Sequence, residues 1–197
     1  MGGQIWSSFK VPYFGYLLII LVMTFGLMSY ETVFSLFAES KYGFTASTIS
    51  IIITMGAIIG IVIQIWLLDF FVKRLGEIKL IRLSLVMTPI ALLLMLIKVN
   101  LVFLLFASAL YFAFNAFLRP TVSSLISKSA GDRQGYASGL NTTYSSLGTV
   151  FGPLVAGMLF DRNVNFPYIF GAIMLLAALS LTIQAQRLKK GNRYASE

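Results

Sequence analysis

The sequence predicts an all-α membrane protein in which six helices cross the bilayer. The chain has 197 residues, of which 58% are hydrophobic and 11% charged, and its mean hydropathy is +0.86. A soluble domain carries about 25% charged residues, so this chain could not cover a water-facing surface. A helix needs about 20 residues to cross a bilayer core of about 30 Å, and the chain has room for six such segments. These observations exclude a soluble enzyme and a disordered polypeptide.

The apolar segments are joined by short polar connections, and none alternates with the period of two that marks a barrel strand. We expect consecutive helices to be antiparallel neighbours in one transmembrane domain over residues 1–197. The predicted spans cover residues 11–38, 46–70, 78–97, 101–126, 136–160 and 166–184. The predicted connections cover residues 39–45, 69–77, 98–100, 127–135 and 161–165.

Local signals support the first four spans in turn. The first has Pro12 near its start, is too long for a signal peptide and has no small-residue cleavage site after it. The second carries Gly56 and Gly60, a spacing that permits close approach of a neighbouring helix. The third and fourth contain Pro89 and Pro120, where we expect a bend.

The fifth predicted span combines small residues with an internal proline. The proline frees the carbonyl of Thr149 and bends the helix, and the glycines allow a neighbour to pack into the bend. A bent, closely packed helix beside a cavity is suited to gating. The residues of this pattern are Gly139, Gly148, Gly152, Pro153 and Gly157. The sixth span begins near Pro167, where a missing N–H does no harm.

Basic residues collect on one side of the predicted membrane. The terminal segments and the second and fourth connections hold Lys10, Lys73, Arg74, Lys79, Arg82, Lys128, Arg133, Arg187, Lys189, Lys190 and Arg193. The opposite side holds Lys41, Lys98 and Arg162. Because cytoplasmic loops carry the excess of lysine and arginine, both termini are predicted to be cytoplasmic. The same bias explains the net charge of +8 without nucleic acid as a partner.

Catalysis and cofactor binding have few possible residues in this chain. The absence of histidine and cysteine excludes His-based acid–base chemistry, thiol nucleophiles and the usual zinc and iron–sulfur sites. No predicted span carries a lysine or a pair of acids well inside it, so a hydrolase site is not expected either. We therefore predict that the chain is not an enzyme and needs no metal or cofactor.

Two ionisable residues, Glu31 and Arg119, lie well inside predicted spans. Inserting such a residue at the centre of a membrane-spanning helix costs about 2.5–3.5 kcal/mol, so both side chains should face the bundle interior or a water-filled cavity. A carboxyl in a medium of low dielectric constant holds a proton more readily, so Glu31 could exchange a proton or attract a cation. The alternatives are an ion pair or a packing hydrogen bond for Glu31, and a purely organising role for Arg119.

Polar and aromatic residues accompany these charges. Phe112, Asn115 and Arg119 lie on one face of the fourth span, and Met28 lies one turn before Glu31. An acid among aromatic and methionine side chains suits an amphipathic organic cation. For Asn115, and for Asn141 in the fifth span, hydrogen bonding between helices is an equal alternative, and for Gln64 it is the favoured one.

Several motifs together resemble one transporter family. The glycine pattern of the fifth span is similar to the antiporter motif of the major facilitator superfamily, and residues 69–76, with Asp69 and Arg74, resemble a degenerate copy of its loop motif. Nearly the whole chain resembles the C-terminal half of bacterial multidrug efflux pumps of the NorA and Bmr type. The matching stretches are residues 25–32, 119–120, 131–141 and 152–161.

The resemblance implies one half of a twelve-helix fold that exchanges drugs for protons by alternating access, driven by the proton gradient in a bacterial inner membrane. It implies proton coupling at Glu31, and a cavity lined by Arg119 and Asn141 that accepts small amphipathic drugs or dyes. Besides the lipid bilayer, the expected partner is an N-terminal six-helix half or a second copy. Two features depart from the family: residues 114–117 lack an acid that some relatives carry, and the antiporter motif belongs to the other half. The alternative is a split or truncated half that serves only as a structural or assembly subunit or forms a homodimer.

Overall fold

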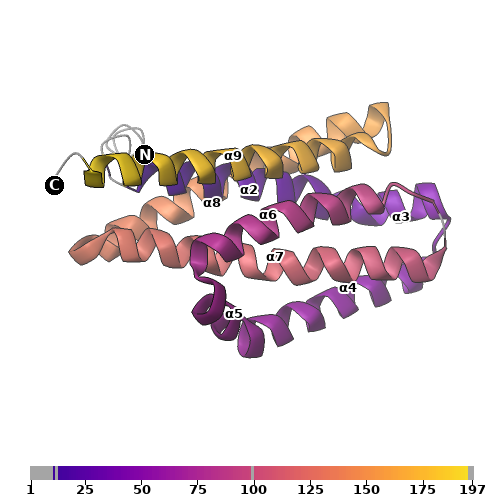
Figure 1. The fold of residues 1–197 in the computed structure, drawn as a ribbon. Coiled ribbons are helices and arrows are strands. Elements are labelled where there is room, and N and C mark those ends of the chain that lie inside the picture. The colour runs from indigo at the N-terminus through magenta and orange to yellow at the C-terminus, as the bar shows by residue number, and fades with distance from the viewer. Residues whose placement is uncertain (1–10, 12, 99, 195–197) are drawn as a thin grey trace.

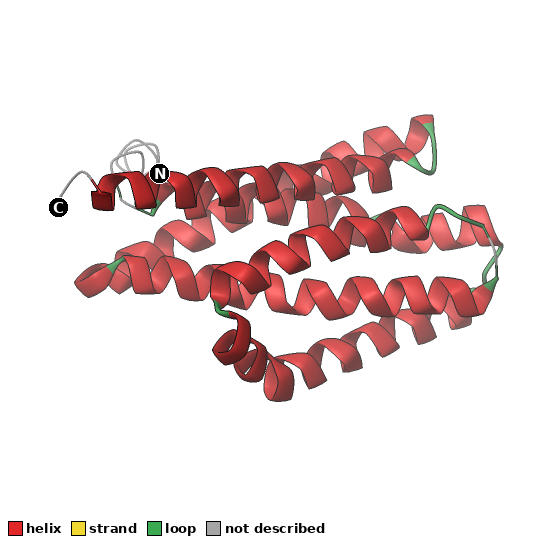
Figure 2. Cartoon of the chain, in the orientation of Figure 1, coloured by secondary structure: helices red, strands yellow, loops and turns green. Residues whose placement is uncertain are grey.

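The computed structural model describes residues 11, 13–98 and 100–194, and within these ranges the chain is helical with short turns (Figure 2). The helices are α2 (Phe14–Glu31), α3 (Phe34–Tyr42), α4 (Ala46–Val62), α5 (Leu68–Leu75), α6 (Glu77–Leu94), α7 (Leu101–Ser129), α8 (Gln134–Arg162) and α9 (Phe166–Tyr194). A π-helix, η1 (Ile63–Leu67), joins α4 to α5, and a 3-10 turn, η2 (Gly131–Arg133), precedes α8. The predicted all-α fold class is confirmed.

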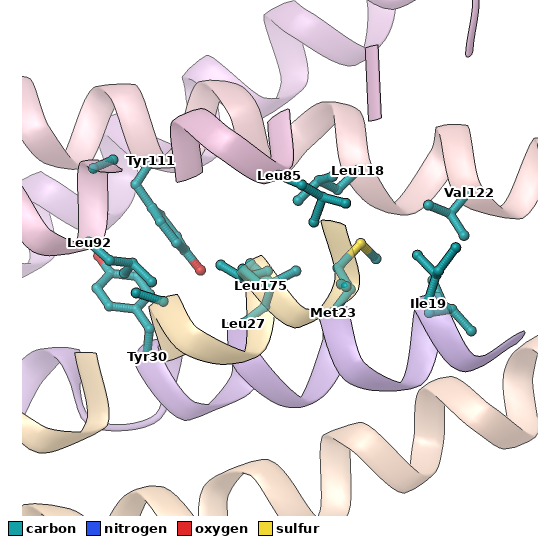
Figure 3. Packing of buried hydrophobic residues seen from close by; sticks show 14 of the residues in the cluster. Ile19, Met23, Leu27, Tyr30, Leu85, Leu92, Tyr111, Leu118, Val122 and Leu175 are labelled. Carbon is teal, nitrogen blue, oxygen red and sulfur yellow. The ribbon is translucent and has the colours of Figure 1, made fainter. Parts of the chain in front are cut away.

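The helices form an elongated bundle in which the chain runs back and forth along one axis (Figure 1). The helix α2 packs against α8 and α9, α6 packs against α7 and α9, and α4 packs against α7. The start of α2 and the end of α9 lie at the same end of the bundle (Figure 1). The core lies between α2, α6, α7 and α9, where Met23, Leu85, Leu118 and Leu175 are fully buried (Figure 3).

Five of the described helical segments are long and apolar enough to cross a membrane. They are Phe14–Glu31, Ala46–Leu75, Leu101–Ser129, Gly131–Arg162 and Phe166–Gln184. The predicted span at 78–97 corresponds to α6, which carries Glu77, Lys79 and Arg82 within its first two turns. These charges lower the hydropathy of its predicted cytoplasmic end, and its crossing of the membrane stays a prediction.

The first predicted span, 11–38, is wrong as one continuous helix. It divides into α2 and α3 at Thr32 and Val33, where the Val33 N–H donates to the Tyr30 carbonyl (3.1 Å) three residues back. The Thr32 hydroxyl donates to the Met28 carbonyl (2.8 Å), a type of side-chain bond that bends helices. Glu31 is consequently the last residue of α2, directly at the break.

The predicted connection at 69–77 is also wrong, because helix α5 continues to Leu75 and Gly76 alone forms the turn. Phe71, Val72 and Leu75 pack on a small cluster that includes Phe117 of α7, which stabilises these turns despite their charges. Gly76 has φ +78°, a conformation in which a side chain would be strained.

Glycines allow the closest helix contacts of the bundle. A Cβ on Gly148 would lie 2.8 Å from the Phe25 nitrogen, and one on Gly152 would lie 2.9 Å from the Phe25 carbonyl oxygen. The helices α8 and α2 therefore meet backbone to backbone, as the glycine pattern predicted. A Cβ on Gly139 or Gly157 of the same pattern would have no such neighbour within 4 Å, so these two glycines are not packing contacts.

One lysine connects three outer segments. The Lys41 ammonium at the end of α3 donates to the Leu96 carbonyl and to Asn165 Oδ1, each at 2.6 Å. It also lies 5.1 Å from the centre of the Phe37 ring. Burial lowers the pKa of Lys41, and the nearby Lys98 charge lowers it further. These contacts tie α3 to the α6–α7 turn and to the α8–α9 turn.

Replacing Lys41 with methionine should therefore destabilise the bundle. We expect a loss of about 1–2 kcal/mol, in the lower part of the range for hydrogen bonds to charged groups because the ammonium is partly exposed. The measurement is thermal unfolding in detergent micelles. The matched control is Lys98→Met, at an exposed residue of the same outer end, which should change stability little. Equal losses in the two variants would contradict the role given to Lys41.

Candidate functional site

The break between α2 and α3 opens on a cleft between α2, α4 and α7. Its volume is about 180 Å³. Glu31 lines it from the end of α2, and the remaining wall belongs to α4, η1 and α7. The lining residues are Glu31, Gly56, Gly60, Gln64, Phe112, Asn115, Ala116, Arg119 and Pro120.

Four of the predicted site residues meet in this cleft. The Asn115 amide nitrogen donates to Glu31 Oε1 at 3.2 Å, which joins α7 to the end of α2. Phe112 and Arg119 lie one turn to either side of Asn115 on the same face of α7. Glu31 and Arg119 are exposed in this chain and line the same cleft.

Two opposite charges set the electrostatics of the cleft. Glu31 is the final residue of α2 and α3 begins at Phe34, so the negative end of one helix dipole meets the positive end of the next and the charge of the carboxylate itself dominates. The guanidinium of Arg119 is always charged and lies in the same cleft, so it partly offsets the negative potential of the carboxylate. The cleft therefore offers a carboxylate, an amide and an aromatic ring at one end and a guanidinium at the other.

The wall behind Glu31 is built from buried tyrosines. The Tyr30 ring lies 4.1 Å from the Tyr111 ring and 5.3 Å from the Tyr168 ring, measured between centroids. All three side chains are fully buried, and Figure 3 shows Tyr30 and Tyr111 side by side. Because Tyr30 precedes Glu31 in the chain, this packing fixes the backbone that carries the carboxylate. No role for Tyr111 or Tyr168 was predicted from the sequence.

Two other predicted ligand residues lie outside the cleft. Met28 lies over Gly152, because a Cβ on that glycine would lie 2.8 Å from the Met28 Cβ, so Met28 contacts α8. The Asn141 amide donates to the Ser123 hydroxyl at 3.0 Å, a bond between α8 and α7. Asn141 lines a second cleft of about 330 Å³ with Pro120, Ser123, Ser124, Ile126, Ser127 and Ser138.

The predicted gating residues fall in two places. Asp69 and Arg74 are exposed on α5, not in a loop, and the Arg74 guanidinium lies 5.9 Å from the centre of the Phe70 ring. The glycines of α8 divide into two pairs. Gly148 and Gly152 pack against α2, and Gly139 and Gly157 have no neighbour within 4 Å of an added Cβ.

The sequence does not predict part of the wall formed by α4 and η1. Gly60 of α4 and Gln64 of η1 line the cleft, whereas the sequence predicts a helix contact for the first and a hydrogen bond between helices for the second. A Cβ on Gly56 would overlap the Phe112 ring, so close approach is real at Gly56. The spacing of Gly56, Gly60 and Gln64 by four residues could have indicated one shared face.

The described residues contain no group of three or more Asp, Glu, His or Cys side chains that could hold a metal ion.

The Major Facilitator Superfamily model matches residues 6–193, nearly the whole chain. The chain belongs to the major facilitator superfamily. The fold is accordingly half of a major facilitator fold, and the resemblance found in the sequence is confirmed.

Several curated members of this superfamily are similar to the chain. Multidrug resistance protein 1 of Bacillus subtilis is 44% identical over 176 residues, which cover 89% of this chain and 45% of the relative. Multidrug resistance protein 2 of the same organism is 39% identical over 176 residues, which cover 89% and 44%. Quinolone resistance protein NorA of Staphylococcus aureus is 36% identical over 186 residues, which cover 94% and 47%. This major facilitator chain thus spans about half the length of the curated relatives it matches.

Proposed function

We propose that this chain is the C-terminal half of a proton-coupled multidrug efflux transporter that exports amphipathic, mainly cationic compounds. The observation that carries the proposal is the Glu31 carboxylate, held by Asn115 in a cleft that also contains Phe112. A carboxylate beside an aromatic face recognises organic cations through charge and cation–π attraction. The similarity to two multidrug resistance proteins and to the quinolone resistance protein NorA supports a role in drug export.

The mechanism is competition between a proton and a cation for Glu31. The ionised carboxylate accepts a cationic compound from the cytoplasmic side, and a proton from outside neutralises the carboxylate and releases the compound. Asn115 orients the carboxyl group by its hydrogen bond. Residues 114–117 are Phe, Asn, Ala and Phe and supply no second acid, so in this proposal either Glu31 alone couples export to the proton or the coupling differs from that of relatives with a second acid.

A further six-helix unit completes the site in this proposal. The cleft volume of about 180 Å³ is below the roughly 300 Å³ that a drug-sized ligand requires. Large apolar side chains on α4 and α8, including Ile58, Ile61, Phe151 and Leu154, are exposed. In this proposal the chain crosses a bacterial inner membrane with both termini in the cytoplasm, and its partner is an N-terminal half or a second copy.

Reconstitution with a complementary half tests the proposal. We expect the chain, coexpressed with an N-terminal half from a similar pump, to export ethidium from membrane vesicles under a proton gradient. A protonophore should stop this export, because it dissipates the proton gradient that drives the exchange of the compound for a proton. An assembled complex that never exports ethidium would instead support the structural-subunit alternative. Coupled transport by the chain alone would contradict its role as a half.

A further inference from the structure

Gly60 is a point on the cleft wall where α4 meets no other described part of the protein. A Cβ built on Gly60 has no heavy atom within 4 Å outside its immediate helix neighbours, yet the residue lines the Glu31 cleft. One turn earlier, a Cβ on Gly56 would overlap the Phe112 ring. The two glycines of the pattern therefore differ: Gly56 makes room for a protein side chain, and Gly60 borders open space.

The surroundings of Gly60 place that space beside the charged groups of the site. Gln64 follows one turn later, within the π-helix η1, and also lines the cleft. Across the cleft lie Asn115 and Arg119 of α7. In a volume of about 180 Å³, a side chain added at Gly60 would take up a large part of the space beside the Glu31–Asn115 pair.

We propose that Gly60 sets the upper size limit of the organic cation accepted by the Glu31 cleft. The bare backbone leaves the α4 side of the cleft open, so part of a ligand whose charged centre lies beside Glu31 can extend past Gly60. A side chain at position 60 would occupy that space and leave the charge-recognition groups unchanged. Bulky cations would then be excluded, and compact ones would still bind. This inference rests on the proposed function, since it takes the ligand to be an organic cation.

Binding of two cations that differ in bulk tests the inference. The probes are tetraphenylphosphonium, which is bulky, and benzyltrimethylammonium, which is compact, titrated into the complex with the complementary half. Gly60→Leu should weaken tetraphenylphosphonium binding about tenfold or more and change benzyltrimethylammonium binding less than about twofold. Gly60→Ala should weaken binding less, and it should again weaken tetraphenylphosphonium binding more than benzyltrimethylammonium binding.

Two further variants, one at Gly60 and one at a neighbouring position, test whether an effect of Gly60→Leu comes from misfolding. Gly60→Ala should keep or raise the unfolding temperature, because alanine favours helix more than glycine does. Weaker binding in a protein of unchanged or greater stability then reports on the site. The matched control is Ala57→Leu, on the exposed face of the same helix and outside the cleft, which should bind both cations normally.

The outcomes separate this inference from the proposed function. If Glu31→Gln weakens both cations while Gly60→Leu weakens neither or both equally, the size-limit role is wrong and the proposed function stands. A loss in Ala57→Leu as large as in Gly60→Leu would also overturn it. If the parent complex binds neither cation through Glu31, the proposed function fails, and the inference fails with it.

Discussion

Replacing Glu31 with glutamine is expected to abolish proton-coupled export of ethidium by the complex with a complementary half. Glutamine keeps the size of the side chain and can still accept the hydrogen bond from Asn115. It removes both the negative charge that attracts a cation and the group that binds the proton. Export should fall to the passive leak, and the response of export to the proton gradient should disappear. The measurement is ethidium uptake into inverted vesicles with an acidic lumen, because export by the complex moves the dye into the lumen of such vesicles.

The control for this prediction removes an acid elsewhere. Glu39→Gln makes the same chemical change at an exposed residue of α3, outside the cleft, and should leave export near its original rate. Equal amounts of both variants in the membrane fraction would show that insertion is intact. Unchanged export by the Glu31 variant would refute the assignment of proton coupling to this residue.

The sequence predicts part of the cleft. Glu31 and Arg119 are costly in contact with lipid, so each is expected to face the bundle interior or a cavity, although this does not predict that they share one. Phe112 and Asn115 follow from helical spacing, because residues three, four and seven apart share a face. Asn115 contacts Glu31 from a distance of 84 positions along the chain.

What the sequence could not predict depends on contacts made after folding. At the break after Glu31, Thr32 donates a hydrogen bond to its own helix, but Thr143 and Thr182 form the same bond in unbroken helices, so the residue type does not predict the break. The extension of α5 to Leu75 depends on the apolar cluster around Phe117, which an average over hydropathy does not detect. The spacing of Gly56 and Gly60 predicts a helix contact at both, because spacing alone does not show whether a helix or open space lies opposite each glycine.

Substituting alanine at Gly148 or Gly152 should destabilise the bundle substantially. A Cβ at Gly148 would lie 2.8 Å from the Phe25 nitrogen and 2.9 Å from the Leu21 carbonyl oxygen. These neighbours are backbone atoms, so no side-chain rotation relieves the overlap and α2 must move away from α8. We expect a loss of about 1–3 kcal/mol per substitution, the usual cost of overpacking. Thermal unfolding in detergent micelles measures it.

The same substitution at Gly139 and Gly157 should have the opposite sign. A Cβ at either position would have no heavy atom nearby, so alanine there adds helix propensity of up to about 1 kcal/mol without a steric cost. The four glycines belong to one sequence pattern, and only the three-dimensional contacts distinguish them. Loss of stability at all four positions would mean that the pattern acts as a unit. Loss at Gly148 and Gly152 alone would mean that the α2–α8 contact, which positions the helix ending in Glu31, is the part of the motif that stabilises this chain.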